Sequence, residues 1–182
     1  YLKRFLQMLS SGYQPKSHWV LKAPIHSVYM SRLSEQFEDA CIVLTHRDPL
    51  EAVPSTCKLF ELGCYFHYGE NSLDRKWVGE TACRMSETMC NRMVEFKEKN
   101  TSANVVDVRY TDIVKDPIGV VKRIYEAVGH EYTQEFEDNM KQYLVENPQG
   151  KHGRNSYDLK HYGLDKEDIE KRFKKYNETY LY

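Results

Sequence analysis

The stretch Thr45–Ser55, THRDPLEAVPS, carries an arginine and a serine eight residues apart. The mainly apolar run at residues 41–45 ends two residues before the arginine and predicts a buried strand. Ligands bind at the carboxyl ends of strands in open α/β folds, so we expect Arg47 at that edge. An arginine fork and a serine hydroxyl together would suit a phosphate monoester. The alternative is that Arg47 pairs with a surface carboxylate and that Ser55 is merely exposed.

Asp48 and Pro49 predict the start of a helix, with Asp as the cap and Pro at the first helical position. Pro54 lacks a backbone donor, so we expect it to kink this helix or to restart it. After a restart, Ser55 would lie in a first turn, where helices bind phosphate. The triplet HRD also occurs in kinase catalytic loops, but the required asparagine is Val53 here and the chain has no DFG. The kinase interpretation therefore fails.

A second set of reactive side chains lies in WVLKAPIH, which ends at His26. Residues 19–22 predict a strand that would deliver Lys22 and His26 to the same sheet edge, with Pro24 keeping the backbone extended. A histidine there can act as a general base, and a lysine can stabilise developing negative charge. A lone histidine is more often structural, so this role depends on the two sets meeting at neighbouring strand ends.

Strand and helix patterns alternate along the chain. The predicted strands are residues 19–22, 41–45 and 105–110, and the predicted helices are residues 27–37, 77–96, 117–128, 133–146 and a terminal helix from about Lys166. Alternation of this kind predicts an α/β fold: a parallel sheet in three layers, with helices on both faces. The methionine and aromatic stripe of residues 77–96 predicts core packing rather than a ligand site.

Composition narrows the class of protein. A chain of 182 residues predicts one domain, residues 1–182, and its net charge of -1 gives no reason to expect a nucleic-acid partner. No apolar run approaches the ~20 residues that cross a bilayer, so we expect a soluble chain. The five cysteines lack zinc spacing, which favours reduced core thiols and no metal. Because the chain begins at Tyr1 rather than Met, we interpret it as the C-terminal part of a longer protein.

Taken in order, the motifs resemble the sulfotransferase family that uses 3′-phosphoadenosine-5′-phosphosulfate (PAPS), in its bacterial-type and related animal branch. The set comprises WVLKAPIH, the 21-residue step to Arg47, the spacing of eight to Ser55, VRYTDIVKDPIGVVKRIYEAVG and NPQGKHGRNSYDLKHYGLD. The likeness runs from about Tyr1 to the end. It implies the P-loop-like sulfotransferase fold and transfer of a sulfonyl group from PAPS to an acceptor hydroxyl or amine, without a metal.

The resemblance also implies roles for individual residues. Arg47 and Ser55 match the pair that holds the 3′-phosphate of the cofactor, and Tyr110 matches a residue beside the adenosine. His26 falls close to the catalytic histidine of the family and Lys22 close to its neighbouring lysine, although KAPIH differs from the more familiar lysine–threonine–histidine form. Three further residues resemble a late basic-glycine element of the family, which closes over the 3′-phosphate. They are Lys151, Gly153 and Arg154.

One departure from the family pattern matters more than the differences in these motifs. The glycine-rich loop that cradles the 5′-phosphosulfate is not found in this sequence, so the fold is expected to be N-terminally incomplete and residues 1–182 alone to be inactive. A non-catalytic nucleotide-binding relative that keeps only the 3′-phosphate site is the alternative function. A P-loop nucleotide kinase shares the architecture but would not need the pair Arg47 and Ser55.

The sequence constrains the acceptor and the cellular compartment less than it constrains the cofactor site. We expect a small-molecule, glycan or lipid acceptor. The aromatic cluster at residues 65–68 fits an acceptor pocket, internal packing or a subunit contact, which leaves a homodimer open. The cytoplasm is the expected location, with the Golgi lumen or a membrane tether as the alternative if an upstream segment carries an anchor.

Overall fold

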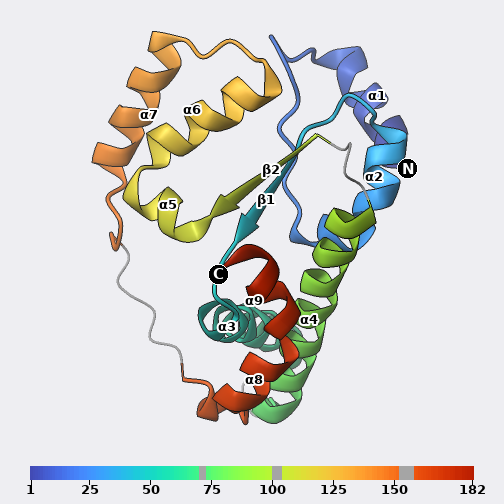
Figure 1. Ribbon diagram of the computed structural model, residues 1–182, viewed down its shortest axis with the longest axis vertical. Helices are drawn as coiled ribbons and strands as arrows, with labels where there is room; N and C mark the ends of the chain where they lie inside the picture. Colours follow the sequence, from blue (N-terminus) through green and yellow to red (C-terminus); the bar gives the residue numbers. More distant parts are fainter. Residues whose placement is uncertain (70–72, 100–103, 152–157) are drawn as a thin grey trace.

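The computed structural model describes residues 1–69, 73–99, 104–151 and 158–182 (Figure 1). Its elements, in chain order, are α1 (Leu2–Gly12), the 3-10 helix η1 (Pro24–Tyr29), α2 (Met30–Gln36), β1 (Ile42–His46), α3 (Pro49–Tyr68), α4 (Arg75–Lys99), β2 (Val105–Arg109), α5 (Tyr110–Lys115), α6 (Pro117–Val128), α7 (Gln134–Glu146), the 3-10 helix η3 (Lys160–Tyr162), α8 (Lys166–Arg172) and α9 (Lys174–Tyr180).

Strands β1 and β2 form a parallel pair, in register from Ile42 beside Val105 to His46 beside Arg109. Parallel neighbours need a long crossover, and α3 and α4 supply it here. Both strands are runs of mainly apolar and β-branched residues, as expected for strands covered on both faces. The predicted α/β class with a parallel sheet is confirmed.

The prediction of a third strand at residues 19–22 is wrong. The structure assigns no strand there, and Val20 and Leu21 are 79% and 48% exposed rather than buried. A strand exists only where its backbone groups pair with a neighbour, and in the part of the chain that the structure describes the sheet consists of β1 and β2 alone. The pattern alone could not supply that partner.

Helices cover both faces of the sheet. On one face, Leu44 of β1 packs in a buried cluster with Met30 of α2 and Phe96 of α4. Side chains alternate along a strand, so Val108 of β2 points to the opposite face, where it is buried and where α6 packs on β2. In Figure 1, α6 and α7 accordingly lie on one side of the strands, and α2 and α4 lie on the other.

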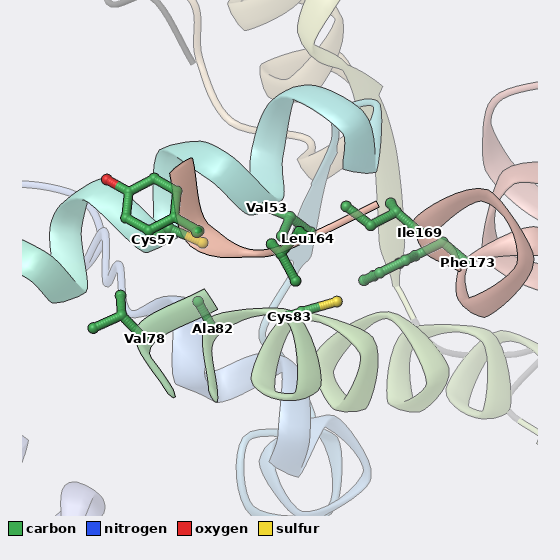
Figure 2. Packing of buried hydrophobic residues seen from close by; sticks show 9 residues of the cluster. Val53, Cys57, Val78, Ala82, Cys83, Leu164, Ile169 and Phe173 are labelled. Carbon is green, nitrogen blue, oxygen red and sulfur yellow. The ribbon is translucent and has the colours of Figure 1, made fainter. Parts of the chain in front are cut away.

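The largest buried cluster lies beyond the sheet, between α3, α4 and the C-terminal helices (Figure 2). Its members are Val53, Cys57, Val78, Ala82, Cys83, Tyr162, Leu164, Ile169 and Phe173. The predicted stripe on α4 forms core in part, because Phe96 is buried with Leu44 and Met93 packs against that cluster, whereas Trp77 is 57% exposed. Burial raises the pKa of the Cys57 and Cys83 thiols to about 11, and both cysteines are free, in agreement with reduced core thiols.

Helix α3 does not restart at Pro54. It begins at Pro49, with the Asp48 carboxylate accepting a hydrogen bond from the Leu50 N–H at 2.8 Å, and continues to Tyr68. An interior proline costs a helix ~3 kcal/mol. The Pro54 ring is fully buried, however, and packing around it offsets the lost backbone bond. Ser55 consequently lies inside the helix and not in a first turn.

Candidate functional site

The carboxyl edge of the sheet brings Arg47 and Tyr110 together. Each is the first residue after its strand, and the strands end in register at His46 and Arg109. The guanidinium carbon of Arg47 lies 4.5 Å from the centre of the Tyr110 ring. A cation placed over an aromatic face is attracted by the ring quadrupole, so the ring restricts where the guanidinium lies.

Arg47 also reaches along the first turn of α3. Its Nε donates to Glu51 Oε2 at 3.1 Å, and the Arg47 side chain is 28% exposed. Ser55 follows Glu51 by four residues, so the two lie on the same face of the helix. Arg47, Glu51 and Ser55 therefore line one strip of surface. The structure does pair Arg47 with a carboxylate, as the alternative interpretation held, and it also places Arg47 beside the face that carries Ser55.

The arrangement suits a phosphate group. The Glu51 contact uses Nε of Arg47, and among the described residues no ion pair engages its two terminal amino groups. Those groups are the planar donors that bind a phosphate in bidentate fashion. Glu51 lies beside them as a competitor for the positive charge.

Behind Arg47, the preceding residue His46 is buried in a polar cluster that the sequence patterns did not predict. His46 Nε2 lies 2.9 Å from Asp107 Oδ1, and its Nδ1 lies 3.0 Å from the Tyr176 hydroxyl. The ring stacks on Tyr180 at a centroid distance of 3.9 Å. Lys97 donates to the second oxygen of Asp107 at 3.2 Å. Burial lowers the pKa of His46, and the hydrogen bond to Asp107 opposes that effect only in part.

One signal in the sequence pointed to this cluster. Ile42, Leu44 and His46 alternate along β1, and Leu44 is buried, so His46 belongs to the inward set. A histidine at such a position needs polar partners from other segments. Nothing local in the sequence identifies those partners.

Lys22 lies in the segment that precedes η1, and His26 lies within η1. Lys22 is exposed, and His26 is half-buried within η1, where its backbone N–H donates to the Ala23 carbonyl at 3.0 Å. Helix η1 packs on α4 and α2. Within residues 1–69 and the other described ranges, no hydrogen bond or ion pair joins either side chain to Arg47. The catalytic role of Lys22 and His26 stays a prediction.

Of the three residues in the late basic-glycine element, the structure describes Lys151. Lys151 Nζ donates to the Glu146 carbonyl at 2.8 Å and to Asn147 Oδ1 at 3.2 Å, so it caps the end of α7. A cation there also favours the negative end of the helix dipole. Gly153 and Arg154 lie outside the described residues. The cofactor role of all three stays a prediction.

The fold places the chain among α/β proteins with a parallel sheet, and Arg47 and Tyr110 lie together at the carboxyl edge of that sheet. The sequence profile described as "Sulfotransferase family" matches residues 2–134. The chain therefore belongs to the sulfotransferase family, which confirms the resemblance.

Individual proteins that are similar to this chain are also sulfotransferases. The omega-hydroxy-beta-dihydromenaquinone-9 sulfotransferases Stf3 of Mycobacterium bovis and Mycobacterium tuberculosis are each 26% identical over 158 residues, which cover 87% of this chain and 39% of theirs. The crystal structure of sulfotransferase STF9 from Mycobacterium avium superposes with a TM-score of 0.87 and 32% identity, over 98% of this chain and 45% of that one. The chain thus spans less than half the length of these relatives.

The described residues include neither a membrane-spanning helix nor a metal-binding cluster. No described helix is both long and apolar enough to pass through a bilayer. Likewise, no cluster of three or more His, Cys, Asp or Glu side chains among the described residues is placed to hold a metal ion.

Proposed function

We propose that this chain carries the 3′-phosphate part of a PAPS site, in a sulfotransferase that transfers a sulfonyl group to an acceptor hydroxyl or amine. The observation that carries the proposal is the guanidinium of Arg47, set over Tyr110 at the sheet edge and beside the α3 face of Ser55. Membership of the sulfotransferase family supports the reaction class.

In this proposal Arg47 binds the 3′-phosphate through its terminal amino groups, and the Ser55 hydroxyl donates a further hydrogen bond. Tyr110 holds the guanidinium in place and offers its ring beside the adenosine. Lys151, Gly153 and Arg154 would close over the same phosphate. PAPS supplies the sulfonyl group when bound. His26 accepts the proton of the acceptor, and Lys22 stabilises the sulfonyl oxygens by its charge.

The acceptor is proposed by class only. The mycobacterial relatives are named as sulfotransferases of a hydroxylated dihydromenaquinone, an apolar molecule with one reacting hydroxyl. A small or lipid-like molecule with a hydroxyl is the corresponding acceptor for this chain. Such an acceptor needs an apolar surface and a single well-placed base, and not a highly charged groove.

Calorimetry with two nucleotides tests the phosphate assignment. Adenosine 3′,5′-bisphosphate should bind more tightly than adenosine 5′-monophosphate, and Arg47→Ala should abolish that preference. A lost charge-assisted contact corresponds to roughly 10- to 150-fold in affinity. Arg32 pairs with Glu35 on the exposed surface of α2, so Arg32→Ala is the matched control and should keep the preference. Equal affinities in the folded, unmutated chain would overturn the assignment.

Turnover tests the catalytic roles. Residues 1–182 made alone should not transfer sulfonyl groups, because their sequence has no glycine-rich loop to meet charge at the 5′-phosphate. In a longer polypeptide that supplies such a loop, His26→Ala should lower turnover by about a hundred- to ten-thousand-fold with cofactor affinity unchanged. Retained turnover in that variant would remove His26 from the mechanism.

A further inference from the structure

We propose that Tyr176 of α9, acting through His46 and the backbone of Arg47, is a positioning residue for the 3′-phosphate site. The inference rests on the proposed function, because it concerns the residue that binds the phosphate there. No motif of the sequence assigned a role to α9. Three contacts converge on the end of β1.

The first contact joins the helix to the residue just before Arg47. The Tyr176 hydroxyl lies 3.0 Å from His46 Nδ1, and both side chains are buried, with exposures of 3% and 1%. The second contact is with the neighbouring backbone of Arg47, which opposes the rise in the pKa of Tyr176 that burial causes. The hydroxyl is thus held directly against His46 and lies next to the end of the strand.

The third contact fixes the directions of these hydrogen bonds. Asp107 is paired with Lys97, so its carboxylate accepts, and His46 Nε2 must donate to it across 2.9 Å. Nδ1 of a neutral imidazole then accepts from the Tyr176 O–H. Both ring nitrogens of His46 have partners in this arrangement, which holds the strand end that carries Arg47 in one place.

A fixed backbone matters because phosphate binding by arginine is directional. The fork of a guanidinium binds in bidentate fashion only when its plane meets the anion correctly. Tyr110 contacts the far end of the Arg47 side chain, and Tyr176 supports the near end through the preceding residue, His46. Losing the near contact would leave the charge present but less well aimed, so phosphate recognition would weaken more than binding of the rest of the nucleotide.

Helix α9 also provides a matched control. Tyr180 lies one turn after Tyr176 and stacks on His46, but its hydroxyl donates to the Met93 carbonyl at 3.0 Å and not to the strand end. Tyr176→Phe and Tyr180→Phe each remove one buried hydroxyl and keep the ring. A merely structural contribution should be similar in the two variants, whereas a positioning role belongs to Tyr176 alone.

The experiment measures affinities of the 182-residue chain for adenosine 3′,5′-bisphosphate and adenosine 5′-monophosphate, together with melting temperatures. Tyr176→Phe should reduce the preference for the bisphosphate by about two- to tenfold, the range of one lost hydrogen bond, and Tyr180→Phe should leave it unchanged. His46→Gln keeps an amide donor for Asp107 but has a carbon at the position where Nδ1 faces the Tyr176 hydroxyl. It should therefore act like Tyr176→Phe, and it tests the inference even if Tyr176→Phe does not fold.

The outcomes are separable. If the unmutated chain shows no preference, the proposed phosphate site is wrong and the inference falls with it. If the unmutated chain shows the preference and both Tyr176→Phe and His46→Gln keep it, the site stands and the inference is wrong. Equal weakening of both nucleotides, with a lower melting temperature, would mean that Tyr176 is only structural and would also overturn the inference.

Discussion

The guanidinium of Arg47 and the ring of Tyr110, which follow different strands, lie 4.5 Å apart because β1 and β2 end in register. The strand pairing itself thus produces the contact. Tyr110 is 37% exposed, so its ring can contact a bound molecule while it orients the arginine.

The first prediction concerns this contact. Tyr110→Ala should weaken binding of adenosine 3′,5′-bisphosphate about two- to fivefold, the range for an exposed cation–π pair, and Tyr110→Phe should keep most of the affinity. Titration calorimetry of the two variants measures the difference. Equal losses in Ala and Phe would assign the effect to the hydroxyl instead of the ring.

Glu51 supplies the second prediction. Its carboxylate accepts from Arg47 Nε and competes with a phosphate for the same charge. Glu51→Gln should therefore raise affinity for the bisphosphate, by up to about fivefold, because an exposed ion pair is worth at most about 1 kcal/mol. Glu35→Gln, which removes the carboxylate of the exposed pair with Arg32, is the control and should leave affinity unchanged. Weaker binding in Glu51→Gln would show that Glu51 helps to place Arg47.

The third prediction is a pH dependence of stability. The charged and titratable groups that face His46 are Asp107 and Arg109 of β2, Lys97 of α4, and Tyr176 and Tyr180 of α9. The folded pKa of His46 lies below its ordinary value of 6.5, mainly through burial, so the unfolded chain takes up this proton more readily. The contribution of neutral His46 to the free energy of unfolding is complete above pH 6.5, and it is lost as the pH falls from there toward the folded pKa of His46.

Urea denaturation at about pH 7.5 and about pH 5.5 measures this effect as the difference in free energy of unfolding. The loss at the lower pH should be smaller in His46→Gln, which cannot take up the proton. An identical loss in the variant and in the unmutated chain would place the pH dependence on other groups.

Two helical glycines give the fourth prediction. A Cβ on Gly79 of α4 would meet the Tyr162 carbonyl oxygen at 2.2 Å, whereas a Cβ on Gly63 of α3 meets nothing within 4 Å. Gly79→Ala should destabilise the chain by about 1–3 kcal/mol through this backbone clash. Gly63→Ala should stabilise it by about 0.5–1 kcal/mol, because alanine costs less entropy in a helix. Chemical denaturation compares the two, and opposite signs are required.

Local signals predicted much of this fold. Residues 41–45 and 105–110 matched β1 and β2 closely, since short apolar β-branched runs favour buried parallel strands. The cap at Asp48 also followed from local chemistry.

Features that depend on distant partners were not predictable in the same way. Residues 19–22 had the pattern of a strand but no paired neighbour among the described residues, and Pro54 is tolerated in α3 because of burial that only the packed fold provides. The cluster around His46 joins three parts of the chain, so no local pattern contains it. Arg47 and Ser55 could be selected from spacing, whereas the support behind Arg47 could not.

The contact between His46 and Tyr176 spans 130 positions of the chain, which places a constraint on the order of folding. During synthesis, at about 5–20 residues per second, β1 leaves the ribosome several seconds or more before α9 exists. Until then the buried imidazole lacks its hydroxyl partner, and the strand end that carries Arg47 is not held. Long-range closure of this kind is slow relative to local helix formation. If the proposed phosphate site is right, the nascent chain should therefore bind nucleotide only after α9 has docked.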